Sequence, residues 1–283
     1  MPMPDWMCRR RITVPASIGL LSVLAIVLAN AAESPLNQTL AGRNWLIPVE
    51  PPAPKPKTKS CPAIRNPDPL MGPRTRLPGN WKGLDPVSAN LPIVVMAGHA
   101  DSQNMAGSGT PGYAVDVRNE KPMDSRMRDE LFWNFKVQKE VVRLGLERGL
   151  NITAYTPSAL TIRNHNDPRT NWSQAKRRSE RGEYVLEIHF DAYSPYGFGS
   201  GLIPAINRRL NRVDESLAQA FGRFPRNFRG GLGGPRRGIG ILEIGMLQGE
   251  LEKRLRDPVA SDATVTCLAE RVVNALERGI KPA

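Results

Sequence analysis

The sequence predicts an α/β fold, in which a single domain holds a mixed, mostly parallel sheet flanked by helices. Three short apolar runs, at residues 92–97, 184–188 and 238–242, are bounded by turn residues, as is typical of buried strands. Segments with helical spacing of apolar residues alternate with these runs, and this alternation favours stacked layers of sheet and helix. We expect the domain to follow a signal segment and a Pro-rich linker.

The elements follow one another in a regular order. After the first run, residues 101–112 are rich in Gly, Ser and Asn and predict a loop. The strongest helix is expected at residues 129–148, between a capping Asp129 and Gly149, and a further strand begins at residues 151–154. The remaining expected elements are helices at 171–181 and 214–224, a Gly/Arg loop at 226–238, and a last helix capped by Ser261 or Asp262.

The N-terminal third is organised differently. Residues 1–32 resemble an export signal, with three arginines, an apolar run and an Ala-Asn-Ala cleavage site at residues 29–31. The run is also long enough to span a membrane, so a retained inner-membrane anchor is the alternative. Residues 33–90 are rich in proline and predict a semi-rigid linker, which either sets the domain at residues 91–283 at a distance from the membrane or wraps its surface. We expect an exported protein, periplasmic or associated with the cell wall.

The net charge indicates which binding partners suit the protein, and the cysteines indicate whether it holds a disulfide. The net charge of +12 suits an anionic partner such as wall polymer, lipid headgroups or nucleic acid. Nucleic acid is not expected, because exported proteins seldom meet it and no nucleic-acid-binding pattern is visible. Cys8 lies in the leader, which leaves Cys61 and Cys267. In an oxidising compartment these two predict a disulfide that ties the linker to the last helix, with two unpaired buried thiols as the alternative.

Polar residues that suit a hydrolytic metal site end the three apolar runs: His99, His189 and Glu243. Reacting groups of open α/β sheets gather outside the carboxyl ends of strands. Catalytic zinc takes three protein ligands and keeps a fourth position for water. The two histidines supply two ligands, and Glu130 in the first turn of the long helix is the expected third, with Glu120 as its rival. A free carboxylate must then accept the proton of the water, and Glu243 is the candidate.

Two further polar residues stand near this set in the sequence. His165 lies in a polar loop, where we expect it to be solvated. Glu187 lies two residues before His189 and therefore on the same face of the strand. It either orients a metal ligand or pairs with a nearby base, and it is left outside the expected site.

Several segments in a fixed order resemble the catalytic domain of the zinc-dependent N-acetylmuramoyl-L-alanine amidases. The resemblance runs from residue 92 to residue 278, nearly the whole expected domain. It rests on residues 97–101 with 106–109 and Gly112, on Glu130 with Asn134 and Gly149, on residues 161–163 with Asp167 and Ala175, on residues 188–192, and on residues 242–247 with Glu250 and Leu255.

The resemblance implies a Zn²⁺ enzyme that cleaves the amide between N-acetylmuramic acid and L-alanine in peptidoglycan. It implies His99, Glu130 and His189 as zinc ligands and Glu243 as general base. Peptidoglycan is the expected partner, and an activator protein stays an open question. The chain departs from the family pattern at Ala100, where a second glycine is usual, and at Asp191, where asparagine is commoner. Residues 246–249 also differ, so the details of the substrate stay open.

Two other functions are consistent with the same residues. One is a different zinc amidohydrolase or carboxypeptidase that acts on wall peptides. The other is a wall-binding relative without catalysis, against which the presence of His99, His189 and Glu243 argues, because a binding module has no need of all three.

Overall fold

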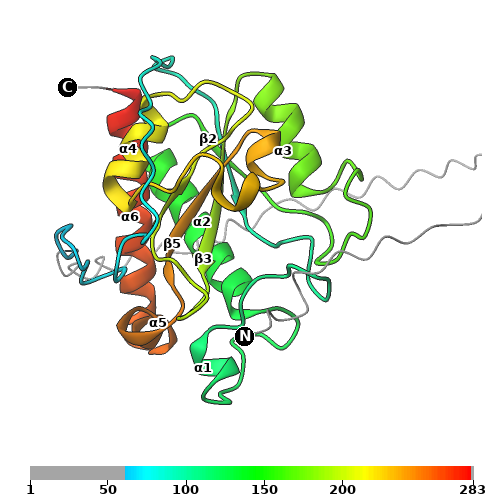
Figure 1. Cartoon of the computed structure of the whole chain (residues 1–283), viewed down its shortest axis with the longest axis vertical. Coiled ribbons are helices and arrows are strands. Elements are labelled where there is room, and N and C mark those ends of the chain that lie inside the picture. Colours follow the sequence, from blue (N-terminus) through cyan, green and yellow to red (C-terminus); the bar gives the residue numbers. More distant parts are fainter. Residues whose placement is uncertain (1–60, 282–283) are drawn as a thin grey trace, which may run out of the picture. The chain divides into compact units, whose positions relative to one another are not determined.

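A five-stranded mixed sheet forms the centre of the computed structural model, which describes residues 61–281 (Figure 1). The strand order is β2-β1-β3-β5-β4, and every pairing is parallel except that of β4 with β5. The strands are β1 (Ile93–Ala97), β2 (Ile152–Tyr155), β3 (Tyr184–Asp191), β4 (Gly201–Ile203) and β5 (Ile239–Met246). The α/β fold with a mostly parallel sheet is therefore confirmed.

Helices cover both faces of this sheet. They are α1 (Tyr113–Asp116), α2 (Asp129–Glu147), α3 (Asn171–Glu180), α4 (Arg212–Phe221), α5 (Gly249–Arg256) and α6 (Ser261–Ile280). The helices α2, α4 and α6 pack on one side of the sheet, and α3 lies on the other (Figure 1). Strand β1 shows why two covered faces suit this sequence, because Ile93 and Val95 enter one core cluster whereas Val94 and Met96 enter the other.

Side-chain caps mark the first turns of two helices, α3 and α4. Thr170 caps α3 by accepting a hydrogen bond from the Ser173 amide. Asn211 and Asp214 form a reciprocal capping box at the start of α4. At α2 the expected cap was wrong, because Asp129 is the first helical residue and Arg128 precedes it without a side-chain cap. The expected cap of α6 was also wrong, because Ser261 is the first helical residue and Ala260 precedes it without a side-chain cap.

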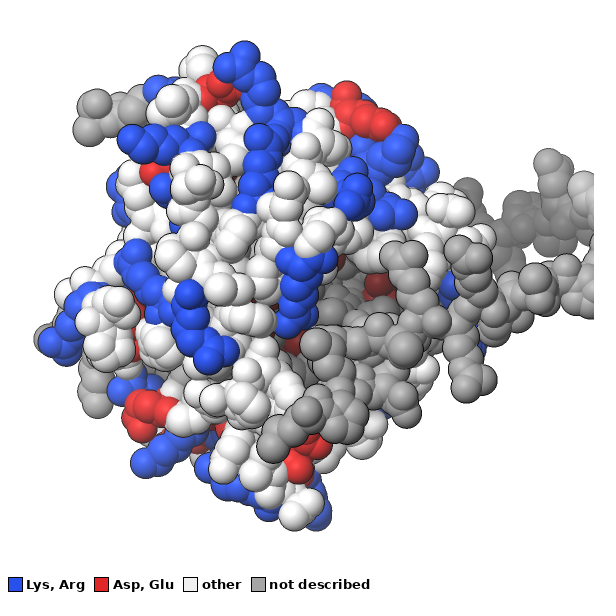
Figure 2. Space-filling view, viewed as in Figure 1, with Lys and Arg blue, Asp and Glu red and all other residues white. Residues whose placement is uncertain are grey.

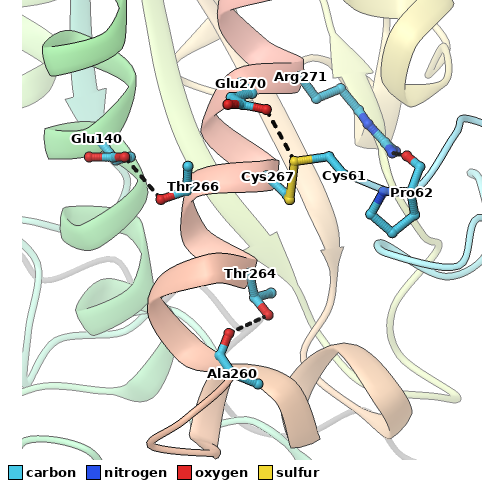
Figure 3. The surroundings of a disulfide bond; sticks show 9 residues. All are labelled: Cys61, Pro62, Glu140, Ala260, Thr264, Thr266, Cys267, Glu270 and Arg271. Atoms are coloured by element: carbon cyan, nitrogen blue, oxygen red, sulfur yellow. Dashed lines mark hydrogen bonds between the residues drawn. A yellow bond between two sulfur atoms is a disulfide. The ribbon is translucent and has the colours of Figure 1, made fainter. Parts of the chain in front are cut away.

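Residues 61–91, which we term the strap, run along the domain without a helix or strand of their own. Cys61 and Cys267 form a disulfide that joins the strap to α6, as the sequence predicts (Figure 3). Nearby, Arg271 donates to Asp68 over 2.7 Å, and both side chains are buried. Leu70, Met71 and Trp81 enter the core, so these residues of the expected linker belong to the folded unit and wrap its surface.

The strap also contacts the loop that follows β3. The Thr75 amide donates to the Ser200 carbonyl over 2.9 Å, and the Arg76 amide donates to the Phe198 carbonyl over 3.0 Å. The N-terminal leader and residues 33–60 lie outside the described residues. Within residues 61–281, no helix combines the length and the apolar character needed to cross a membrane.

Candidate metal centre

Three side chains of ligand type meet at the carboxyl edge of the sheet: His99, Glu130 and His189. Glu130 Oε1 lies 3.2 Å from His99 Nε2 and 3.1 Å from His189 Nδ1. The three ligand-type atoms all lie within 4.8 Å of one another. The structure thus brings together the three residues that the sequence nominated as metal ligands.

His99 owes its position to the turn that ends β1. Its backbone adopts a left-handed conformation with φ of 64°, and its carbonyl accepts a hydrogen bond from the Gln103 amide group over 3.0 Å. The Gly98 amide before it donates to the Ile188 carbonyl of β3 over 2.8 Å. Gly98 also leaves room for the second histidine, since a Cβ built there would lie 2.2 Å from His189 Cε1.

Glu130 reaches the site from the first turn of α2 and is buried. Its Oε2 accepts a hydrogen bond from the Thr110 amide over 2.7 Å. Asn134, one turn later, donates to the Gly98 carbonyl over 3.1 Å and so holds α2 against the end of β1. Burial alone would raise the pKa of Glu130, but the adjacent imidazoles outweigh it and hold that pKa far below its usual value.

His189 stands within β3, two residues before the strand ends. The strands β3 and β5 continue past the polar residues that we expected to end them, because Phe190 and Ile244 still point into the core beneath the sheet. Burial disfavours protonation of the His189 ring, but the carboxylates of Glu130 and Glu187 outweigh it, and the metal-free ring has a pKa well above its usual value.

Glu243 lies beside His189 on the neighbouring strand, because the two residues are register partners in the β3–β5 pairing. Its Oε2 is buried and has no hydrogen-bond partner among the described residues. Burial raises the pKa of Glu243 well above its usual value, and the nearby carboxylate of Asp191 adds to the rise. This carboxyl group is thus able to hold a proton under conditions in which an exposed one is ionised.

The distances within the cluster fit a small divalent cation. Ligand atoms 2.0–2.1 Å from a tetrahedral zinc ion lie roughly 3.3 Å apart. The two separations from Glu130, 3.2 and 3.1 Å, are close to this spacing, whereas the two histidine nitrogens lie within 4.8 Å of each other. Two imidazoles with one carboxylate are a common donor set for catalytic zinc. Without a cation, Glu130 is confined between two imidazole rings whose nitrogens both face it.

The other sequence candidates fall elsewhere. Glu120 forms ion pairs with Arg118 and Arg256 and does not join the cluster, which leaves Glu130 beside the histidines. His165 is exposed, as expected, and lies against Trp172. In the Gly/Arg loop, Arg237 lies over the Trp172 ring and donates to the Gly233 carbonyl.

Glu187, which the sequence places on the same face as His189 but outside the expected site, lies beside that histidine. Glu187 Oε2 lies 3.2 Å from His189 Nε2, on the side of the ring opposite Glu130. The only sequence signal for this contact is the spacing of two residues along a strand, which places both side chains on one face.

Comparisons with known proteins returned solved structures alone, since no family model and no curated protein matches the chain. AmiC2 of Nostoc punctiforme shares 15% identity over 68% of this chain and 100% of its own, with a TM-score of 0.41. The catalytic domain of CwlV from Bacillus (Paenibacillus) polymyxa var. colistinus shares 14% sequence identity. The match covers 66% of this chain and 99% of that domain, with a TM-score of 0.43. CwlD from Clostridioides difficile, solved in complex with the GerS lipoprotein, shares 12% sequence identity. The match covers 65% of this chain and 98% of CwlD, with a TM-score of 0.41. AmiC2 and CwlV are N-acetylmuramoyl-L-alanine amidases, the family that the sequence motifs resemble.

Proposed function

We propose that the protein is a zinc-dependent peptidoglycan amidase that hydrolyses the amide between N-acetylmuramic acid and L-alanine. The observation that carries the proposal is the contact of Glu130 with both His99 and His189, with Glu243 in register beside them. The choice of substrate rests on the family resemblance of the segments that hold these four residues. His99, Glu130 and His189 would hold the ion.

In the proposed reaction, the zinc ion and the residue Glu243 have different roles. Zinc supplies a Lewis acid that activates water and polarises a carbonyl. Glu243 accepts the proton of the attacking water and passes it to the leaving nitrogen of alanine. A carboxylate in this position can accept a proton from water and donate it again, because it lies buried beside the clustered side chains.

The disulfide of the strap supports an exported location. The Cys61–Cys267 disulfide is of a kind that persists outside the reducing cytoplasm. Lys and Arg side chains are spread over the face shown in Figure 2, and the net charge of +12 attracts the anionic polymers of a cell wall. We propose that the protein acts in the periplasm or at the wall.

Mass spectrometry of the products released from purified peptidoglycan tests the proposal. The purified protein is incubated with zinc and, in parallel, with a chelator. We expect peptides that begin with L-alanine together with glycan strands free of peptide, and we expect both to disappear on chelation and return with zinc. Shortened stem peptides would identify a carboxypeptidase instead, and intact material with a zinc-loaded protein would contradict catalysis.

A pair of carboxylate variants locates the general base. Glu243→Gln should retain zinc and lose turnover, because the amide cannot accept the proton of water. Glu120→Gln is the matched control, since Glu120 pairs only with Arg118 and Arg256 on the surface. Equal turnover in the two variants would contradict the role assigned to Glu243.

A further inference from the structure

Glu187 is a buried carboxylate that the proposed reaction does not use. It belongs to β3 and points to the same face as His189, two residues further on. Its Oε2 lies 3.2 Å from His189 Nε2, while His189 Nδ1 faces Glu130. Each ring nitrogen of His189 therefore has a carboxylate oxygen within 3.2 Å, although the contact of Nε2 with Glu187 does not have the geometry of a hydrogen bond.

Glu187 is itself fixed by a second buried side chain. Asn171, the first residue of α3, donates through Nδ2 to Glu187 Oε1 over 2.8 Å. The same amide group donates to the Ala97 carbonyl at the end of β1, also over 2.8 Å. Asn171 is 1% exposed and Glu187 is 4% exposed, so water does not compete strongly for these contacts.

The network extends to the segment that carries the first histidine. Asp101, two residues after His99, accepts a hydrogen bond from the Asn171 backbone amide over 2.7 Å. Asn171 thus joins the end of β1, the turn after His99 and the carboxylate behind His189. A single buried amide residue ties together the two chain segments that supply the histidines.

We propose that Glu187, held by Asn171, is a positioning residue that orients His189 toward the metal and strengthens its binding. The inference rests on the proposed function, because it presumes a metal at His189 Nδ1. A carboxylate beside the far ring nitrogen favours the tautomer that carries its proton there, restricts the orientation of the ring, and makes the ligating nitrogen more basic. Glu187 is not one of the three clustered ligands, so its action passes through His189.

Zinc affinity of the full chain, measured by competition with a chromophoric chelator, tests this role. Glu187→Gln should weaken zinc binding by about 10- to 100-fold, the usual loss when such an outer partner is removed. Asn171→Ala should weaken it in the same direction, because Glu187 then loses the amide that holds it. Glu252→Gln is the control: Glu252 is equally buried, accepts the Ala114 amide, and contacts none of the three ligands.

The outcomes separate the inference from the proposed function. If the wild-type chain fails to bind zinc, the proposed metal centre is wrong. If the wild type binds and Glu187→Gln and Asn171→Ala bind as tightly, Glu187 has only a structural role. Thermal unfolding of the metal-free proteins verifies folding, and a loss of affinity in a variant that unfolds at the wild-type temperature supports positioning. The visible spectrum of the Co²⁺-loaded protein should also change in Glu187→Gln, whereas in Glu252→Gln it should not.

Discussion

Replacement of Gly98 by alanine perturbs the site through one atom. The added Cβ would lie 2.2 Å from His189 Cε1 and 2.3 Å from Nε2. Non-bonded carbon atoms prefer separations of about 3.5–4.0 Å, so the ring must retreat by at least roughly 1.3 Å. The backbone at Gly98 is not left-handed, so the substitution introduces no conformational strain of its own.

This displacement is large on the scale of metal coordination. Metal–ligand distances in proteins hold to within about 0.2 Å, so a ring displaced by more than 1 Å no longer ligates through Nδ1. We expect zinc affinity to fall by more than the ~100-fold upper limit for loss of an outer partner. Overpacking of this kind should also destabilise the metal-free fold by about 1–3 kcal/mol.

Chelator competition measures the affinity, and denaturant unfolding of the metal-free protein measures the stability. The alanine substitution is made in the wild type and in His189→Ala, where the missing ring leaves room for the new methyl group. Its effect on stability should largely vanish in the second background. Gly240→Ala in β5 is the matched control, because its Cβ meets no atom nearer than Tyr184 Oη at 3.3 Å. Wild-type zinc affinity in Gly98→Ala, or an equal loss of stability in both backgrounds, would refute the reasoning.

Three further predictions concern the strap, the base and the ligands. Cys61→Ser should lower the free energy of unfolding by up to about 5 kcal/mol, because the disulfide closes a loop over a separation of 206 residues and so reduces the entropy of the unfolded chain. A denaturation midpoint equal to that of the oxidised wild type would contradict the disulfide. Burial raises the pKa of Glu243, so ionisation of this group costs the metal-free fold more and more free energy of unfolding as the pH rises above 4.5. Glu243→Gln should therefore be more stable than the wild type at about pH 8 and equally stable at about pH 4. Denaturation at the two pH values decides this, and a difference that does not grow with pH would be inconsistent with it. Glu130→Gln should abolish stoichiometric zinc binding by calorimetry whereas Glu120→Gln should not, and the reverse result would make Glu120 the ligand.

The strands and the clustering of His99, Glu130 and His189 could be predicted because their signals are local. Each apolar run matches a strand, and the polar residue at its end marks the functional edge of the sheet. The extent of β3 and β5 could not be predicted in this way. His189 and Glu243 interrupt the apolar runs, yet both strands continue because every second residue still faces the core. In these strands, a polar residue marks a site on the face of the sheet rather than the end of the strand.

Elements without a periodic signal escaped prediction. Strand β4 has three residues, too few for an alternating pattern. Helix α5 is mostly charged and buries Leu251 and Leu255 only through its contact with the rest of the domain. In the strap, Leu70 and Trp81 are buried one by one, at positions set by tertiary contacts and the disulfide rather than by any repeat. The sequence indicated that Glu187 either orients a metal ligand or pairs with a base, but it could not choose between the two, because a spacing of two residues is shared by many pairs on any strand.

The sign of the charge reverses between the surface and the site. The chain as a whole is strongly basic, yet five carboxyl groups lie in or next to the cluster of His99, Glu130 and His189: Asp101, Glu130, Glu187, Asp191 and Glu243. Burial raises the pKa of Asp101, Asp191 and Glu243, and a neighbouring carboxylate raises the pKa of each of these three groups further. A divalent cation held by His99, Glu130 and His189 would offset much of this repulsion, so that metal binding and folding stability are coupled. Under the proposed function, the basic exterior would act over a longer range and concentrate anionic polymer at the surface, while the acidic interior would retain the cation that the hydrolysis requires.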